Sequence, residues 1–139
     1  MTSLGQTGLR PARASREDLD AGEIISVVRE EMLPLERNFF RRADVLRQSL
    51  GRLDAAWSGL RRQARDDGIS AAKTREAAAM IATSRWAYAS ALARSESRGM
   101  HRRIDVPAAD PGFVCAFEAA GLDRVGVTRR ELGEEAPAR

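Results

Sequence analysis

The stretch Arg94-Ser-Glu-Ser-Arg-Gly-Met-His-Arg-Arg-Ile-Asp-Val-Pro107 places charges of both signs directly behind a long alanine-rich segment. It holds the only histidine of the chain, His101. Gly99 suits the left-handed residue that follows a helix, and Pro107 favours an extended conformation at the residue before it. The stretch therefore predicts the end of a helix, followed by a turn and an extended segment.

The charged and turn-forming residues of this stretch are the candidate site of the chain. They are Arg94, Glu96, Ser97, Arg98, Gly99, His101, Arg103, Asp105 and Pro107. Glu96 and Asp105 can pair with the neighbouring arginines or with His101, so an ion-paired helix terminator is the simplest interpretation. A catalytic interpretation uses His101 as a general acid or base that Glu96 or Asp105 orients. A lone histidine beside arginines is more often a structural donor, and it is a poor metal-ligand set. We therefore assign no catalytic, cofactor-binding or metal-binding residue.

The composition narrows the classes of protein to consider. The 139 residues fit one domain, and much of the 43% apolar fraction is alanine. A net charge of +3, from 23 basic and 20 acidic residues, does not indicate a nucleic-acid-binding protein, which concentrates basic residues on one face. The single cysteine, Cys115, excludes an intramolecular disulfide. With no apolar run of membrane-spanning length and no signal-peptide core, we expect a cytoplasmic protein without an integral membrane segment.

The chain divides into a disordered lead-in over residues 1–14, a helical bundle over residues 15–107, and an irregular tail over residues 108–139. Low hydrophobicity predicts the disorder of the lead-in. A first helix begins near residue 17, with Ser15 or Asp18 as its N-cap. It ends at Pro34, because proline lacks the N–H that a helix interior needs.

Two longer helices are predicted to form an antiparallel hairpin. The first, over residues 38–66, carries apolar residues at steps of four and three, which form a packing seam: Leu46, Leu50, Leu53, Trp57 and Leu60. The second, over residues 71–97, has Ser70 as its N-cap and follows the stop signal Gly68. Together with the first helix, this hairpin predicts an all-α fold built as a three-helix bundle.

The spacing of the candidate site residues resembles a signature of a known family. The pattern Arg-x-Glu-Ser-Arg-Gly-x-His-x-Arg-x-Asp-x-Pro over residues 94–107 is similar to one in the C-terminal helical domain of succinate dehydrogenase and fumarate reductase flavoproteins, a group that includes L-aspartate oxidase. The resemblance covers roughly residues 21–110. Its looser part follows the family order with Met32, Arg41 or Arg42, Leu46, Leu50, Leu53 and Glu76.

The resemblance implies a helical domain that packs against a flavin-binding domain of an oxidoreductase. In that family FAD lies in a glycine-rich nucleotide-binding domain, and the helical domain does not carry the main hydride-transfer groups. This chain has no Gly-x-Gly-x-x-Gly behind a strand, so we expect no cofactor in it and FAD on a partner chain. Arg98, His101 and Arg103 would then contact the partner, a FAD-containing flavoprotein.

Several functions remain open from the sequence. The leading hypothesis is an accessory subunit, or detached C-terminal domain, that supports a FAD-bearing chain and is not catalytic alone. The alternative is a stand-alone helical protein-interaction module with no redox role. The apolar helix faces are also compatible with a homo-oligomer. A nucleic-acid-binding protein and an autonomous enzyme are the least favoured classes.

Overall fold

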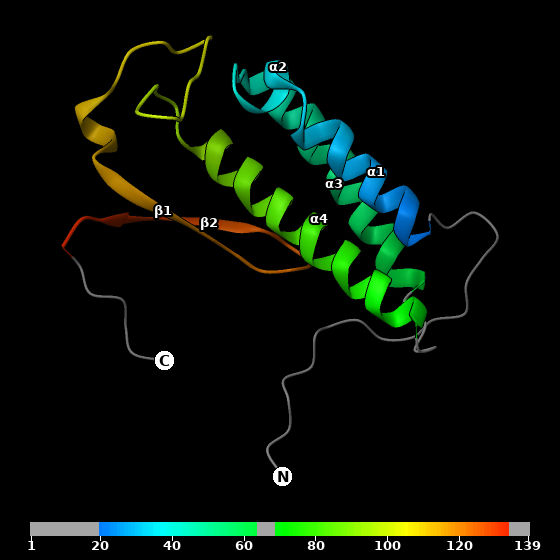
Figure 1. Ribbon diagram of the computed structural model, residues 1–139. Helices are drawn as coiled ribbons and strands as arrows, with labels where there is room; N and C mark the ends of the chain where they lie inside the picture. Colours follow the sequence, from blue (N-terminus) through cyan, green and yellow to red (C-terminus); the bar gives the residue numbers. More distant parts are fainter. Residues whose placement is uncertain (1–19, 64–68, 134–139) are drawn as a thin grey trace.

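The structure, a computed structural model, describes residues 20–63 and 69–133. Its elements are α1 (Ala21–Met32), α2 (Leu35–Asn38), α3 (Ala43–Gln63), α4 (Ile69–Ala93), a 3₁₀ turn (Pro111–Phe113), β1 (Cys115–Ala120) and β2 (Gly126–Glu131). The helices α1, α3 and α4 all contact one another, and the hairpin of β1 and β2 packs on α4. Figure 1 shows α4 between the hairpin and α1. The predicted helical character of the chain is thus confirmed, with a small sheet added to it.

The first helix begins at a capping box. The Asp20 carboxylate accepts a hydrogen bond from the Glu23 N–H at 2.9 Å, and the Glu23 carboxylate accepts one from the Asp20 N–H at 2.6 Å. This arrangement satisfies backbone donors that a helix start leaves unpaired. The cap candidates Ser15 and Asp18 lie outside the described residues. The helix ends at Met32, just before Pro34 as predicted.

The core lies between the three long helices. Leu46, Leu53, Trp57 and Leu60 of the predicted seam on α3 are buried, and Leu50 packs against the core at its edge. Across from them, α4 buries small residues together with Ile81 and Tyr88. Helix α4 begins at Ile69, before the predicted cap Ser70, and ends at Ala93 rather than at residue 97. Gly68 lies outside the described residues.

The region after residue 108, predicted to be irregular, contains an antiparallel strand pair. Its register joins Cys115 to Glu131 and Ala120 to Gly126. Gly121 makes the bend with a φ of +93°, a value that side chains disfavour. Contact with α4 holds the hairpin, because the Trp86 indole N–H donates to the Gly121 carbonyl at 2.7 Å. The alternation of apolar and polar residues in these strands is too weak to predict a strand pair. Packing against α4 stabilises the sheet instead.

Candidate functional site

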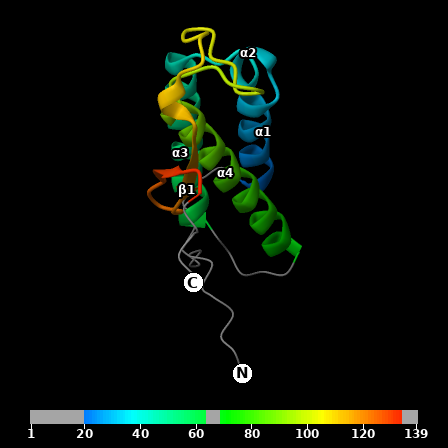
Figure 2. The ribbon, with the colours of Figure 1, turned by 90° about the vertical axis from the view of Figure 1, so that its left-hand side faces the viewer.

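The candidate site is the turn that follows α4. In Figure 2 the chain after α4 crosses over the end of the helices, close to α2. A paired backbone closes the turn: the Arg98 N–H donates to the His101 carbonyl at 2.9 Å, and the His101 N–H donates to the Arg98 carbonyl at 3.0 Å. Gly99 lies between them with the predicted left-handed φ, +56°, but it serves this turn rather than the helix end, because α4 already ends at Ala93. The turn is therefore a compact, hydrogen-bonded structure.

Glu96 is the buried acceptor at the start of the turn, with none of its surface exposed. Its carboxylate accepts hydrogen bonds from Arg94 Nη1 at 2.5 Å, from Arg98 Nε at 2.9 Å and from the Asp110 N–H at 2.8 Å. The bond from Arg98, with those from Asp110 and Arg94, outweighs burial and lowers the pKa of Glu96 to about 2. Glu96 is thus an ionised anchor that joins the end of α4 to the segment before β1.

Arg103 and Asp105 form the second anchor. Arg103 is 3% exposed and donates from Nε and Nη2 to the two Asp105 oxygens at 2.8 and 2.9 Å. The Asp105 carboxylate also accepts from the Ala43 N–H at 2.9 Å, at the first residue of α3. The hydrogen bond from Arg103 is the main cause that holds the pKa of Asp105 well below its usual range. This pair therefore fixes the turn to the start of α3.

The neutral imidazole of His101 links the segment before α3 to the end of α4. Its Nδ1 lies 2.9 Å from Arg41 Nη1, and its Nε2 lies 3.1 Å from the Arg94 carbonyl. A guanidinium only donates, so Nδ1 accepts from Arg41 and the Nε2–H donates to Arg94. Burial lowers the pKa of His101, and the charges of Arg41, Arg103 and Arg94 act in the same direction. With both ring nitrogens bonded inside the chain, His101 has none free to exchange a proton with a substrate.

The remaining candidate residues complete the same network. The Ser97 hydroxyl accepts a hydrogen bond from the Arg103 N–H at 2.8 Å and donates one to the Val106 carbonyl at 2.9 Å. Arg94 also donates to the carbonyls of Phe113 and Cys115, at 2.8 and 2.6 Å, which ties the turn to the hairpin. The structure thus brings the predicted site residues together, and the hydrogen bonds named above link the turn to other segments of the same chain.

Sequence reasoning named Arg41 as one of two candidates in the looser pattern but did not predict its contact with His101, because no local signal pairs two residues 60 positions apart. It also missed three residues between the motif positions. Met100, Arg102 and Ile104 alternate with His101 and Arg103, and all three are exposed. They lie on the outer side of the turn. The alternation of side chains along an extended segment is the signal that could have predicted this position.

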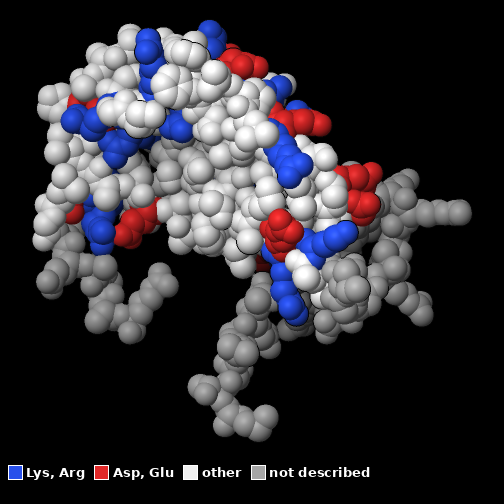
Figure 3. All heavy atoms as spheres, in the orientation of Figure 1, with Lys and Arg blue, Asp and Glu red and all other residues white. Residues whose placement is uncertain are grey.

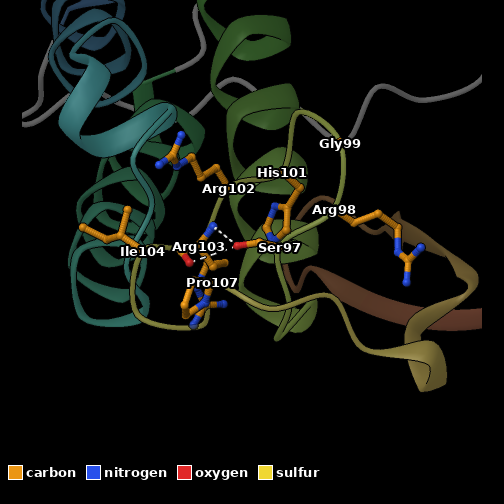
Figure 4. Close-up of a pocket in the computed structure, with 8 residues that line it drawn as sticks. All are labelled: Ser97, Arg98, Gly99, His101, Arg102, Arg103, Ile104 and Pro107. Atoms are coloured by element: carbon orange, nitrogen blue, oxygen red, sulfur yellow. Dashed lines mark hydrogen bonds between the residues drawn. The ribbon is translucent and has the colours of Figure 1, made fainter.

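A hollow of about 380 Å³ opens beside the turn. Figure 4 shows the residues that line it, which are Ser97, Arg98, Gly99, His101, Arg102, Arg103, Ile104 and Pro107. None of these eight residues is acidic.

Between residues 20 and 133, apart from the gap at 64–68, no group of three or more His, Cys, Asp or Glu residues is arranged to hold a metal ion. Over the same ranges, no helix is both long and apolar enough to cross a bilayer.

Comparison with known proteins identifies one family from the sequence and finds the same fold in solved structures. A family model described as the fumarate reductase flavoprotein C-terminus matches residues 35–123. No curated protein matches the sequence. The Mycobacterium smegmatis Sdh1 complex in its apo form contains a similar chain, with a TM-score of 0.68 and 20% identity over 95% of this chain. A mutant of the E. coli quinol fumarate reductase FrdA gives a TM-score of 0.66 and 18% identity over 93% of this chain. This chain spans 23% of each of those two chains.

Proposed function

The chain belongs to the fumarate reductase flavoprotein C-terminal family, and on that basis we propose that it is a helical accessory domain that completes a FAD-bearing oxidoreductase chain. One observation carries the proposal. Nearly the whole chain, 95% and 93% of it, aligns with only 23% of two far longer flavoenzyme chains. A flavin-bearing partner would supply the part of those chains that has no counterpart here.

We assign the flavin to the partner rather than to this chain. A dinucleotide is held where a strand leads through a glycine-rich turn into a helix. In the described part of this chain both strands follow the last α-helix, so no strand leads into an α-helix. The chemistry that FAD supplies is electron transfer to and from a substrate, and the contribution of this chain is structural.

The surface of the domain supports a role in contact with another protein. Several large apolar side chains are exposed, among them Leu33, Leu35 and Met100 at 64% to 77%. Burial of such side chains gives association its main driving force, at about 25 cal/mol per Å² of apolar surface. The turn behind α4 supplies a firmly held part of that surface, since Glu96, Arg103 and His101 are bonded internally.

Co-expression tests the proposal. The probe is a flavoprotein of this family from the source organism, expressed without its C-terminal helical domain and called here the truncated flavoprotein. The full chain, carrying the only affinity tag, is expressed with the truncated flavoprotein and purified by affinity and size exclusion. We expect one peak that contains both chains in equal amounts and shows flavin absorbance.

The same preparation can contradict the proposal. If the tagged chain elutes without flavin and melts cooperatively by itself, the accessory role is wrong. That result would favour the stand-alone interaction module. A control with the tag on an unrelated helical protein excludes capture of the flavoprotein by the resin.

A further inference from the structure

We propose that the turn displays a binding surface for an acidic segment of the FAD-bearing partner. This surface, called the turn patch, consists of Phe40, Met100, Arg102 and Ile104, and the last two also line the hollow beside the turn. The inference rests on the proposed function and extends it by naming the contact residues and the charge of the partner segment. The signature residues His101 and Arg103 support the turn patch from inside and do not form it.

Alternation along the turn separates the supporting residues from the displayed ones. His101 and Arg103 point inward, where they bond to Arg41, Arg94 and Asp105. The residues between and beside them are exposed, with Met100 at 77% and Ile104 at 46%. In Figure 4, Arg102 and Ile104 lie together on one side of the turn, away from Arg98. Exposed apolar side chains on a strongly bonded backbone are typical of an interface.

Phe40 joins this surface from the segment before α3. The Arg41 N–H donates to the Arg102 carbonyl at 3.0 Å, and the Ile104 N–H donates to the Arg41 carbonyl at 2.9 Å. These two bonds place Phe40 next to Arg102, whose guanidinium lies 5.5 Å from the centre of the Phe40 ring. Phe40 is 39% exposed. Aromatic, methionine and arginine side chains are enriched at protein interfaces, and this patch combines all three.

The charge of the patch indicates an acidic occupant. Arg98 and Arg103 line the hollow but are already paired with Glu96 and Asp105. Arg102 has no ion pair with a carboxylate in the described part of the chain, and its guanidinium lies over the Phe40 ring. In Figure 3, basic side chains lie at this end of the molecule with acidic ones beside them. A carboxylate from the partner would complement Arg102, while Met100, Phe40 and Ile104 would cover its apolar flank.

The internal network reduces the cost of binding. A flexible loop loses conformational freedom when it docks, which subtracts from its affinity. Here the backbone of the turn is already held on both sides by Ser97, Asp105 and Arg41. The turn patch is therefore presented in one arrangement before the partner arrives.

The test measures the affinity of the full chain for the truncated flavoprotein by titration calorimetry. Ile104→Ser and Arg102→Glu are the test variants, and each is expected to weaken binding by about thirtyfold, the effect of losing one interface hot spot. The loss from Arg102→Glu should shrink at high salt, because screening weakens exposed charges. Leu132→Ser and Arg124→Glu, at exposed positions of the hairpin region, are the matched controls and should change affinity less than about twofold. Thermal melts of all four variants check that the fold is retained.

Each outcome distinguishes the two proposals. If the wild-type chain binds the truncated flavoprotein but the two test variants bind equally well, the turn patch is wrong and the accessory role stands. If the wild-type chain does not bind, the accessory role fails and the turn patch fails with it. Saturable binding of malonate by the chain alone, lost in Arg102→Glu, would overturn the protein partner in favour of a small-anion site.

Discussion

Replacing Arg103 tests whether the turn is an anchor of the whole fold. Arg103→Met keeps a side chain of similar length but removes both bonds to the Asp105 carboxylate and a bond of 3.2 Å to the Arg94 carbonyl. The Arg94 carbonyl still accepts from His101. Asp105 keeps only its bond from the start of α3 among these contacts. The variant therefore leaves a charged carboxylate short of its partner.

The structure sets the size of the effect. Breaking a buried ion pair by removing one partner costs about 3–5 kcal/mol of unfolding free energy. The Asp105 side chain is 28% exposed, so water can replace part of what it loses. We therefore expect the lower limit, about 3 kcal/mol, which corresponds to a fall in Tm of about 10 °C for a domain of this size. Arg103→Lys, which keeps the charge without the two-pronged geometry, should cost less than Arg103→Met.

The chain provides its own control for this measurement. Arg129 pairs with Glu131 at 2.9 Å, also two residues apart, but these side chains are 46% and 61% exposed. Arg129→Met should cost less than about 1 kcal/mol, as exposed pairs do. Urea unfolding followed by circular dichroism gives both values. Equal losses for Arg103→Met and Arg129→Met, or a loss below about 0.5 kcal/mol for the former, would refute the anchoring role.

Two further predictions concern His101 and the glycines. The native state holds the pKa of His101 below its ordinary value, so the unfolded chain binds more protons at acidic pH. The free energy of unfolding should therefore fall as the pH drops below about 6.5. A midpoint of urea unfolding that does not change between about pH 7.5 and 5.5 would contradict this. Gly121→Ala should destabilise the hairpin, because a Cβ would lie 2.1 Å from the Arg124 carbonyl oxygen. Gly51→Ala should stabilise the fold by about 0.5–1 kcal/mol, because it lies inside α3 and an added Cβ there meets no other atom. Thermal melts that rank the two variants in the opposite order would show this reasoning to be wrong.

Local patterns in the sequence predicted the helical part of the fold well. The seam from Leu46 to Leu60 placed α3 against the core, because apolar residues at steps of four and three share one face of a helix. Pro34 marked the end of α1 and Gly99 marked a turn, because both signals depend on backbone chemistry alone. The pairing of β1 with β2 was not predicted, since β1 is rich in alanine, neither strand has a strong apolar pattern, and both pack on α4.

The sequence by itself determined the family and the list of site residues, because the spacing of charges, glycine and proline from Arg94 to Pro107 is a local property. Tertiary structure alone decided what those residues do. Arg41 reaches His101, and Asp105 reaches the N–H of Ala43, across about 60 positions of sequence. Such pairings depend on how α3 and α4 pack, which no short-range pattern encodes. They direct His101 and Arg103 inward and leave Met100, Arg102 and Ile104 on the surface.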